Sequence, residues 1–301
     1  MHEPRVTILL ATYNGERYLA EQLDSIVQQT HKNWNIIASD DGSSDQTMQI
    51  LDQYNIPVCY GPHQGFAANF LSLITKVSTA SDYYAFSDQD DVWEQYKLEQ
   101  ALAWLQSIPE AVPALYCGRT QLVDEYLNVI GYSPLFKRQP GFLNALAQNI
   151  GGGNTMMFNR AALNLLRQTK SHTDIVSHDW WAYLLISGAG GAVYYDTEPS
   201  IRYRQHATNL VGSNTNLFAR CYRVRMLLQR RFKHWLDLNC KSLFAVAHLL
   251  TPENKQLLEQ FEKARKGWFF SKCIQIKLLG IYRQTTIGQI GLLIGALLNK
   301  I

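Results

Sequence analysis

Four short apolar runs, each followed by a polar turn and an amphipathic segment, occupy the first hundred of the 301 residues. These runs lie at 6–11, 34–39, 57–60 and 83–86, and each has the length of a buried strand. The segments between them repeat their apolar residues at helical spacing, most clearly from Tyr18 to Val27. This alternation predicts an α/β fold, Rossmann-like in its layering, with a mainly parallel sheet flanked by helices.

The middle of the chain continues the pattern less regularly. Strands are predicted at 114–123, 155–158 and 194–203, and a strongly apolar helix at 180–186. Another helix is expected to begin near Glu94. The dinucleotide fingerprint G-x-G-x-x-G after the first strand and the Walker pattern G-x-x-x-x-G-K are both absent from the sequence. Their absence argues against a typical dehydrogenase or P-loop enzyme.

Polar side chains stand where the predicted strands end. The first, second and fourth runs are followed by Thr-Tyr-Asn-Gly at 12–15, Asp-Asp-Gly-Ser-Ser-Asp at 40–45 and Ser-Asp-Gln-Asp-Asp-Val-Trp at 87–93. The carboxyl ends of parallel strands meet at one edge of a sheet, and open α/β sheets bind ligands there. The sequence therefore predicts a carboxylate-rich crevice at this edge.

The stretch at 87–93 contains three carboxylates, Asp88, Asp90 and Asp91, within four positions. Like charges this close repel, so each is hard to keep ionised without a cation. A hard divalent ion with oxygen ligands removes the conflict, and a nucleotide diphosphate can complete its coordination shell. The alternative is a solvated acidic turn that precedes the next helix.

Asp40 also has two interpretations. Its carboxylate can accept the imide N–H of uracil or thymine and the hydroxyls of a ribose. Alternatively, Asp40 and Asp41 only form the turn after the second strand, a common position for Asp.

Three features of the second half are candidates for function. Asp179 precedes Trp180 near the start of the apolar helix, where it is either an N-cap or a general base whose pKa is raised by desolvation. His206 lies in a polar loop after a strand, where it is structural or contacts metal or phosphate. The glycine run at 151–153, followed by Asn154, allows a close approach to a ligand or makes a flexible turn.

Charge divides the chain unevenly. Residues 1–218 carry 13 basic and 21 acidic side chains, whereas 219–301 carry 15 basic and 4 acidic ones. From about residue 216 the basic side chains alternate with apolar ones, as in an amphipathic helix, and 287–298 is again apolar. Basic amphipathic helices are typical of attachment to an anionic membrane surface. The alternative is a helical appendage that packs on the body of the protein.

Cysteine and leader patterns indicate the compartment. The five cysteines are scattered without a C-x-x-C pair, which fits a reducing cytosol. We expect no secretion signal and no transmembrane helix, because no apolar run is long enough. Nucleic acid is not an expected partner, since the body is acidic and no nucleic-acid-binding motif is present.

Taken together, these motifs resemble family 2 glycosyltransferases of the GT-A fold over about residues 4–212. The segments at 12–15, 40–45 and 87–91 and the pair His178-Asp179 stand in the order of that family. The form Ser-Asp-Gln-Asp-Asp-Val-Trp is similar to that of bacterial rhamnosyltransferases that build O-antigen or other surface polysaccharides. The resemblance implies inversion at the anomeric carbon and a Mg²⁺ or Mn²⁺ cofactor.

The resemblance also implies roles for single residues. Residues that would line the nucleotide pocket are Thr12, Tyr13, Asn14 and Glu16, with Asp40 at the base and Asp88 at the ribose. Asp90 would bind the metal, with Asp91 and His206 as further ligands. Asp179 would remove the proton of the acceptor hydroxyl.

Two departures from the family pattern matter. The acidic pair before the acceptor helix is often Glu-Asp, and here it is His178-Asp179, which leaves the role of His178 open. The Q-x-x-R-W element of processive synthases is missing, which favours transfer of a single sugar.

The sequence thus predicts a glycosyltransferase domain at 1–215 and a basic, membrane-associating helical region at 216–301. The expected reaction moves one sugar, rhamnose from dTDP-rhamnose in the narrower prediction, onto a lipid-linked saccharide acceptor. The expected location is the cytoplasmic face of the plasma membrane, as a peripheral protein. The alternative is a non-catalytic nucleotide-sugar binder or scaffold on the same fold, which would have no use for Asp179.

Overall fold

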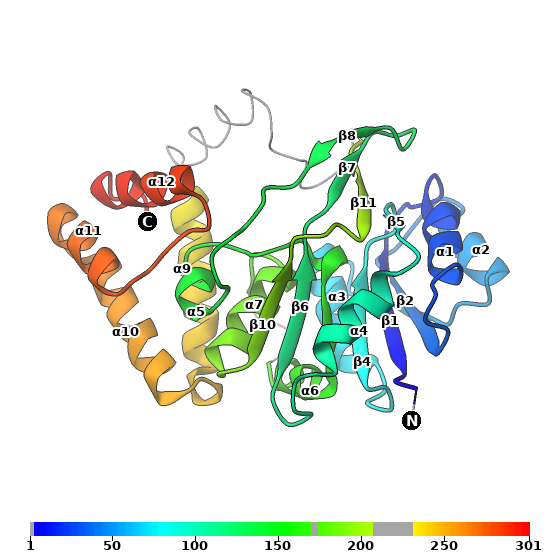
Figure 1. Cartoon of the computed structure of the whole chain (residues 1–301), viewed down its shortest axis with the longest axis horizontal. Coiled ribbons are helices and arrows are strands. Elements are labelled where there is room, and N and C mark those ends of the chain that lie inside the picture. Colours follow the sequence, from blue (N-terminus) through cyan, green and yellow to red (C-terminus); the bar gives the residue numbers. More distant parts are fainter. Residues whose placement is uncertain (1–2, 170–173, 207–230) are drawn as a thin grey trace.

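The computed structural model describes residues 3–169, 174–206 and 231–301, and a seven-stranded sheet runs through its body. The strands, in spatial order, are β10 (Ala192–Asp196), β6 (Ala114–Gly118), β9 (Met157–Asn159), β4 (Tyr83–Ser87), β1 (Val6–Thr12), β2 (Trp34–Asp40) and β3 (Val58–Tyr60). Every pairing is parallel except those of β9, which is antiparallel to β4 and β6. The carboxyl ends of the other six strands therefore share one edge (Figure 1).

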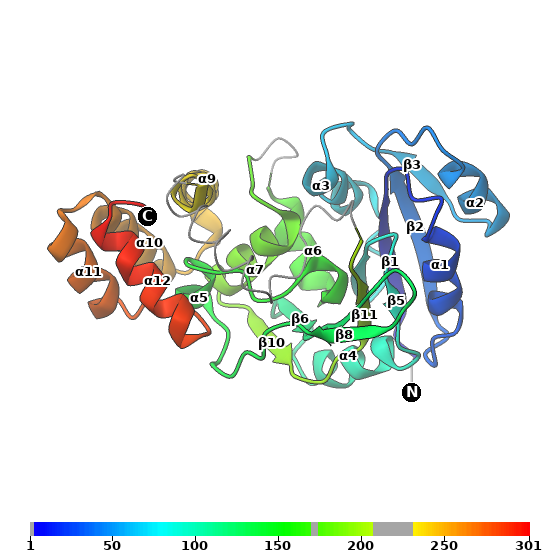
Figure 2. The same ribbon diagram turned by 90° about the horizontal axis from the view of Figure 1, so that it is seen from above.

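Helices cover both faces of this sheet (Figure 2). On one face, the core contains side chains from α3 (Phe66–Lys76), α6 (Arg160–Arg167) and α7 (His178–Gly188). On the other, it contains side chains from α1 (Leu19–Val27), α2 (Thr47–Gln53) and α4 (Lys97–Leu105). The prediction of an α/β fold with a mainly parallel sheet flanked by helices is confirmed.

Two of the predicted strands are each divided between two sheets. A second sheet has the order β5 (Val92–Trp93), β11 (Ile201–Arg204), β7 (Gln121–Val123) and β8 (Val129–Tyr132). The run at 114–123 is therefore β6 and β7, and the run at 194–203 is β10 and β11. Pro199 explains the second division, because a proline cannot donate to a strand ladder.

The helix expected near Glu94 begins three residues later, at Lys97. Residues 92–93 form β5 instead, because Trp93 is buried and pairs with β11. The backbone N–H of Trp93 donates to Ser25 Oγ at 3.0 Å, and that of Glu94 donates to Ser200 O at 3.0 Å. Tertiary pairing thus delays the start of α4.

Two short helical elements lie between β8 and β9. After β8 the chain runs to α5 (Phe142–Ala145), and a 3-10 turn, η1 (Gly153–Thr155), precedes β9. Asn159 caps α6, since its side chain accepts from the N–H of Ala162 at 3.0 Å.

Within the described residues 231–301, four helices follow the body: α9 (Arg231–Ala245), α10 (Pro252–Lys266), α11 (Phe269–Leu278) and α12 (Thr286–Leu297), with a 3-10 turn, η2 (Ala247–Leu249), after α9. Helix α9 packs against α7, where Trp235 meets Trp180 edge-on at 6.5 Å, and α11 lies farthest from the sheet (Figure 1). The buried residues of these helices, among them Leu243 and Phe261, belong to the same hydrophobic cluster as Trp181. These helices therefore pack on the body. The expected boundary at 215/216, and most of the basic helix expected from 216, lie outside the described residues.

Among the helices of the described segments, none is long and apolar enough to cross a membrane.

Candidate active site

Two loops at the carboxyl edge, one after β1 and one after β2, are joined by hydrogen bonds. The backbone N–H of Asn14 donates to Ser43 Oγ at 2.8 Å, and Asn14 Oδ1 accepts from the N–H of Ser44 at 2.8 Å. Asn14 has a positive φ of 48°, a conformation that asparagine tolerates better than most residues. Glu16 Oε2 accepts from the N–H of Gln46 at 3.0 Å. The side chains of Asn14 and Glu16 thus hold the two loops together.

Asp40 is buried at the end of β2, and its carboxylate accepts hydrogen bonds from its own loop. Oδ2 accepts from Thr12 Oγ1 at 2.9 Å and Ser43 Oγ at 2.6 Å. Oδ1 accepts from the N–H groups of Ser43 at 2.8 Å and Gly42 at 3.1 Å. Asp40 therefore forms the turn, and contact with a nucleotide base stays a prediction. Tyr13 is 58% exposed.

The acidic turn after β4 brings carboxylates close together. Burial and the charges of Asp90 and Asp179 raise the pKa of Asp88 to about 8. This effect places Asp179, from the start of α7, near Asp88, although 91 positions separate them in the sequence. A cation near Asp88 and Asp90 would offset the repulsion between these carboxylates, and the sequence predicts such a cation.

Asp90 contacts His206 directly. Asp90 Oδ2 lies 2.8 Å from His206 Nε2. The Asp90 side chain is 21% exposed and the His206 side chain 7% exposed. Arg204, two residues earlier, donates from Nε to Asp90 O at 2.9 Å and also pairs with Glu21. The end of β11 therefore positions both His206 and the backbone of the acidic turn. Two of the three predicted metal ligands are brought together.

Asp91 is oriented differently, into the interior. It is fully buried, with Oδ2 accepting from Asn154 Nδ2 at 2.6 Å and Oδ1 from the Arg204 N–H at 3.3 Å. Burial and the charges of Asp90 and Asp88 raise the pKa of Asp91. The Asp91 carboxylate thus stabilises the turn from the protein interior, and it is not among the proposed metal ligands.

A lysine that the sequence analysis did not single out lies beneath this turn. Lys97 is fully buried with Nζ 4.2 Å from the centre of the Trp93 ring, and burial lowers its pKa to about 7. The charge of Asp91 opposes this lowering. The sequence around Lys97 resembles any first turn of an exposed helix, so nothing in it signals this burial.

The donor set fits a divalent cation in part. Within the described segments, no cluster of three or more His, Cys, Asp or Glu side chains could hold a metal ion. Asp90 and His206 supply one carboxylate and one imidazole, a combination that suits Mn²⁺ and accepts Mg²⁺ through the carboxylate. Diphosphate oxygens and water would have to complete the shell.

Asp179 lies in the first turn of α7 and is partly exposed. Ser177 occupies the N-cap position, so Asp179 is not the N-cap that one interpretation expected. Oδ1 accepts from the N–H of Trp180 at 2.6 Å. The two indoles are buried, with Trp180 Nε1 donating to Ala145 O at 2.8 Å. Asp179 is therefore placed by the helix end, with Asp88 as a charged neighbour.

His178 and the glycine run, whose roles the sequence left open, pack against each other. The His178 ring is buried, stacks on Phe70 at 3.9 Å and meets Phe86 edge-on at 4.9 Å. A Cβ on Gly153 would come within 2.2 Å of His178 Nε2. Gly153 thus makes room for the imidazole, and Asn154 holds Asp91.

Gln89 is a further residue that the sequence analysis missed. Its side-chain amide accepts from the Tyr13 N–H at 2.8 Å and donates to Tyr13 O at 2.9 Å. This pair of bonds ties the acidic turn to the loop after β1. Gln89 stands inside the acidic stretch, but no spacing signals a partner 76 positions away.

Comparison with solved structures identifies the class of protein. S. aureus TarS 1-349, solved in complex with UDP-GlcNAc, superposes with a TM-score of 0.55 at 14% identity, covering 98% of this chain and 90% of its own. The mannosyltransferase PcManGT of Pyrobaculum calidifontis, solved with GDP-Man and Mn²⁺, gives 0.51 at 17% identity, covering 100% and 86%. The fold is that of the GT-A glycosyltransferases.

Sequence comparison then gives the family. The profile described as Glycosyl transferase family 2 matches residues 7–166, just over half of the chain. The dTDP-rhamnosyl transferase RfbG of Shigella flexneri is 30% identical over 240 residues, covering 74% of this chain and 81% of its own. This protein belongs to glycosyl transferase family 2, which confirms the resemblance expected from the motifs.

Proposed function

We propose that this protein is an inverting, metal-dependent glycosyltransferase that moves one sugar from a nucleotide donor onto a lipid-linked saccharide. The observation that carries the proposal is the meeting at one sheet edge of the Asp90–His206 pair with Asp88, which lies near Asp179. A metal-binding pair beside a separate carboxylate is the arrangement that sugar transfer from a diphosphate requires.

The donor half of the reaction lies on the acidic turn. When bound, a divalent cation would neutralise the charge that develops on the leaving diphosphate. Asp90 and His206 would hold it, and Asp88 would receive the ribose. The loops at 12–16 and 40–46, joined by Asn14 and Glu16, would enclose the nucleotide. Nucleotide sugars occupy the TarS and PcManGT structures, which supports a donor of this class.

The acceptor half requires a base. Asp179 would accept the proton of the acceptor hydroxyl as that oxygen attacks the anomeric carbon from the face opposite the nucleotide. A single displacement of this kind inverts the configuration. The similarity to a protein named as a dTDP-rhamnosyl transferase supports dTDP-rhamnose as the donor and surface polysaccharide, such as O-antigen, as the product.

Attachment to the cytoplasmic face of a membrane is also part of the proposal. On α11, Phe270, Ile274 and Leu278 form an exposed stripe, and Leu278 is 80% exposed. On α12, Ile287, Ile290 and Ile294 form another, with Ile287 74% exposed. We call these six residues the apolar face.

Length and charge favour a bilayer as the partner of the apolar face. With 12 residues, α12 is about 18 Å long, too short to span roughly 30 Å of hydrocarbon. Residues 268–301 contain four lysines or arginines, of which Lys272 is buried, and no Asp or Glu. A helix of this kind lies in the interface, with its apolar side in lipid and cations at the headgroups.

Nucleotide release from a panel of dTDP-, UDP- and GDP-sugars tests the catalytic proposal. We expect release from one donor with Mn²⁺ or Mg²⁺, and none with chelator. Asp90→Ala should lose at least about a hundredfold in release, because the diphosphate then lacks its metal anchor. Asp179→Asn should lose about as much transfer yet bind donor with unchanged affinity.

Asp174→Asn is the matched control, since Asp174 is exposed and its carboxylate pairs, among the described residues, with the exposed Lys241. It should behave as the wild type. A non-catalytic binder or scaffold on the same fold would show donor binding by calorimetry without release, and Asp179→Asn would leave its binding and its role unchanged. That result would reject the transferase.

A further inference from the structure

The carboxyl edge of the sheet carries different charged groups along its length. Asp40 ends β2, and Asp88 and Asp90 follow β4, so this half of the edge is acidic. At the other half, Arg119 follows β6 directly, while the carboxylate of Asp196 at the end of β10 accepts from Tyr116 Oη at 2.8 Å and Gln100 Nε2 at 2.9 Å. Since β6 and β10 run parallel, with Gly118 opposite Asp196, both strands deliver their ends to this edge. A ligand that needs a metal fits the first half, and a ligand that carries its own negative charge fits the second.

A groove of about 460 Å³ lies at the β6–β10 end. Its walls are the ends of these two strands and the connection 135–140 that leads from β8 to α5. Three cations line it, Arg119, Lys137 and Arg138, against one carboxylate, that of Glu198. We call it the basic groove, and its net charge attracts phosphate esters rather than neutral sugars.

Lys137 is the best placed cation to bind a ligand. It is exposed, and within the described segments its ammonium makes no hydrogen bond or ion pair. The other two cations are held in place: Arg119 Nε donates to Ser133 O at 2.9 Å, and Arg138 Nη1 donates to Arg283 O at 3.2 Å. Two oriented guanidinium groups beside a free ammonium suit an anion with several oxygens.

Aromatic side chains form the rest of the walls. Phe136, Tyr194 and Tyr195 line the groove, and Tyr194 is 38% exposed while its ring stacks on Trp104 at 5.3 Å. Aromatic faces next to a few charged groups are typical of small-molecule sites, and rings of this kind pack well on the apolar faces of sugars. The basic groove therefore suits a saccharide that carries phosphate.

The basic groove lies close to the helix that carries Asp179. Gly141, next to its wall, donates its N–H to Tyr183 Oη at 2.8 Å and accepts from the same hydroxyl at 3.0 Å. Tyr183 is four residues beyond Asp179 on α7, a rise of roughly 6 Å. The groove wall is thus linked to the helix whose first turn carries Asp179, although α7 itself is buried from Trp180 to Gly188.

The groove also borders the start of α12. The Arg138 guanidinium lies 4.0 Å from the centre of the Tyr282 ring, and the backbone N–H of Arg138 donates to Gln284 Oε1 at 3.1 Å. Helix α12 begins two residues after Gln284, at Thr286, and the apolar face continues from Ile287. A charged head in the groove would therefore leave an attached apolar chain near the face proposed to meet lipid.

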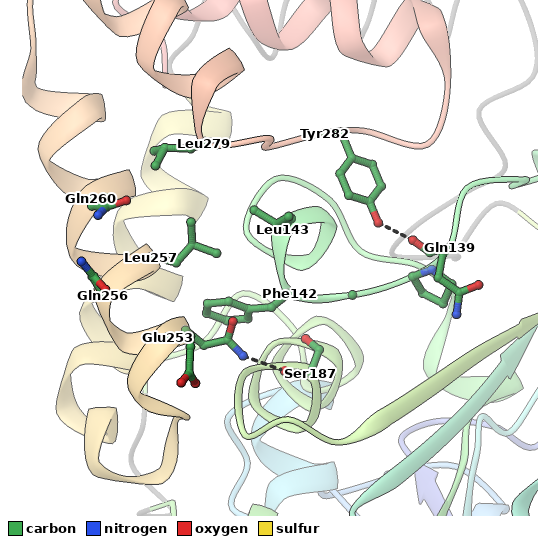
Figure 3. Close-up of a pocket in the computed structure, with 13 residues that line it drawn as sticks. Gln139, Phe142, Leu143, Ser187, Glu253, Gln256, Leu257, Gln260, Leu279 and Tyr282 are labelled. Carbon is green, nitrogen blue, oxygen red and sulfur yellow. Dashed lines mark hydrogen bonds between the residues drawn. The ribbon is translucent and has the colours of Figure 1, made fainter.

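A neighbouring hollow does not share this chemistry. It has a volume of about 620 Å³, lies between α5 and α10, and meets the groove at Gln139 and Pro140 (Figure 3). The only charged residue of its lining is Glu253, an anion, beside uncharged residues such as Gln256 and Leu257. The anionic ligand is thus assigned to the groove alone.

From these observations we infer that the basic groove binds the phosphate or diphosphate of the saccharide acceptor. The inference rests on the proposed function, and it deepens that function by giving the acceptor a phosphate and a place. Arg119, Lys137 and Arg138 recognise the phosphate, while Asp179 faces the hydroxyl that receives the new sugar.

Binding of inorganic pyrophosphate to the full chain tests the inference, measured by calorimetry in chelator so that no metal-bridged binding occurs at the acidic turn. The wild type should bind. Lys137→Glu should weaken binding at least about tenfold, because it removes one charge-assisted contact and adds a repulsive charge. The control Lys255→Glu changes the same charge on an exposed lysine of α10 outside the groove lining, and should leave binding unchanged.

Absence of binding in the wild type, or equal weakening in both variants, would overturn the inference. Vesicles of phosphatidylcholine with and without phosphatidylglycerol distinguish an acceptor phosphate from a lipid headgroup. We expect both variants to bind vesicles equally. If Lys137→Glu instead loses vesicle binding and keeps pyrophosphate, the groove binds headgroups and the inference is wrong.

Nucleotide release separates this inference from the proposed function. Donor hydrolysis without acceptor should be the same in Lys137→Glu and the wild type, because the variant lies away from the acidic turn. A wild type that binds pyrophosphate but releases no nucleotide from any donor would leave the groove intact and reject the transferase instead.

Discussion

His178 is a buried imidazole that makes no hydrogen bond through either ring nitrogen within the described segments. Phe66, Phe70 and Phe86 surround its ring, and Gly153 leaves it space. Burial lowers the pKa of His178 to about 4. The neutral ring therefore behaves as an apolar side chain beside the proposed base. An apolar group thus occupies the position where the family often has a second carboxylate.

This low pKa predicts a pH-dependent stability. The unfolded chain binds a proton at an ordinary histidine pKa of about 6.5, whereas the folded chain does not until about pH 4. The free energy of unfolding should therefore fall as pH falls from 6.5 to 4, by about 3 kcal/mol from this residue. Urea denaturation of the wild type and His178→Leu across this range measures the effect.

The variant should lose part of that pH dependence, whatever its absolute stability. His248→Gln is the control, because His248 is exposed on η2 and its change should leave the slope intact. Parallel pH profiles for the wild type and His178→Leu would show that the buried ring is not the cause.

At the level of single residues, sequence patterns predict chemistry better than orientation. Asp90 and His206 were both expected at a metal, and they lie in contact. Asp91 was expected there too, yet its carboxylate turns toward Asn154. Asp90 and Asp91 follow each other in an irregular turn, so which of the two carboxylates stays near the surface depends on what the other contacts inside the protein.

At the scale of elements, the loops of the donor half are joined mainly by side chains that bond to backbone groups. Gln89 bonds to both backbone groups of Tyr13, as a neighbouring strand would. The loop after β1 is held from the other side by Ser43. This mutual support holds the loops of the proposed nucleotide site in place, which would reduce the ordering cost of binding.

Gln89→Ala should therefore weaken donor binding while leaving the fold intact. Loss of about 1 kcal/mol of net hydrogen bonding corresponds to roughly a fivefold higher donor Kd, measured by calorimetry with metal present. Gln53→Ala is the matched control, since the Gln53 side chain is exposed on α2, outside these loops, and makes no hydrogen bond within the described segments. Equal Kd values for Gln89→Ala and the wild type would contradict this role.

The bounds of secondary-structure elements were predicted well where the local sequence determines the element. The strands β1 to β4 fall at or within a residue of their predicted bounds. The second sheet was not foreseen, because β5 and β11 consist of only two and four residues. Such short strands exist through long-range pairing, which local periodicity does not encode.

For the whole molecule, the apolar face predicts behaviour at membranes. Leu278→Glu combined with Ile287→Glu should weaken sedimentation with anionic vesicles at least tenfold. Two exposed apolar side chains that would enter the lipid are then replaced by negative charges that the headgroups repel. Raising the salt concentration should weaken the wild type as well, since its cations then lose attraction to the headgroups.

Ile130→Glu serves as the control, because Ile130 is 55% exposed on β8, in the body. It should sediment like the wild type. If the double variant sediments normally, or if it instead converts a dimer into a monomer, the apolar face contacts another copy of the chain and not lipid.

The sequence by itself determined the layering of the body, the acidic edge and the family, since each depends on local periodicity or on residues close together in the chain. Only the tertiary structure decided which distant groups meet. Asp88 lies near Asp179, Asp90 touches His206, and β6 and β10 place the basic groove on the same edge. These contacts join residues from 78 to 116 positions apart, and the packing of whole elements, not any local pattern, sets their distances.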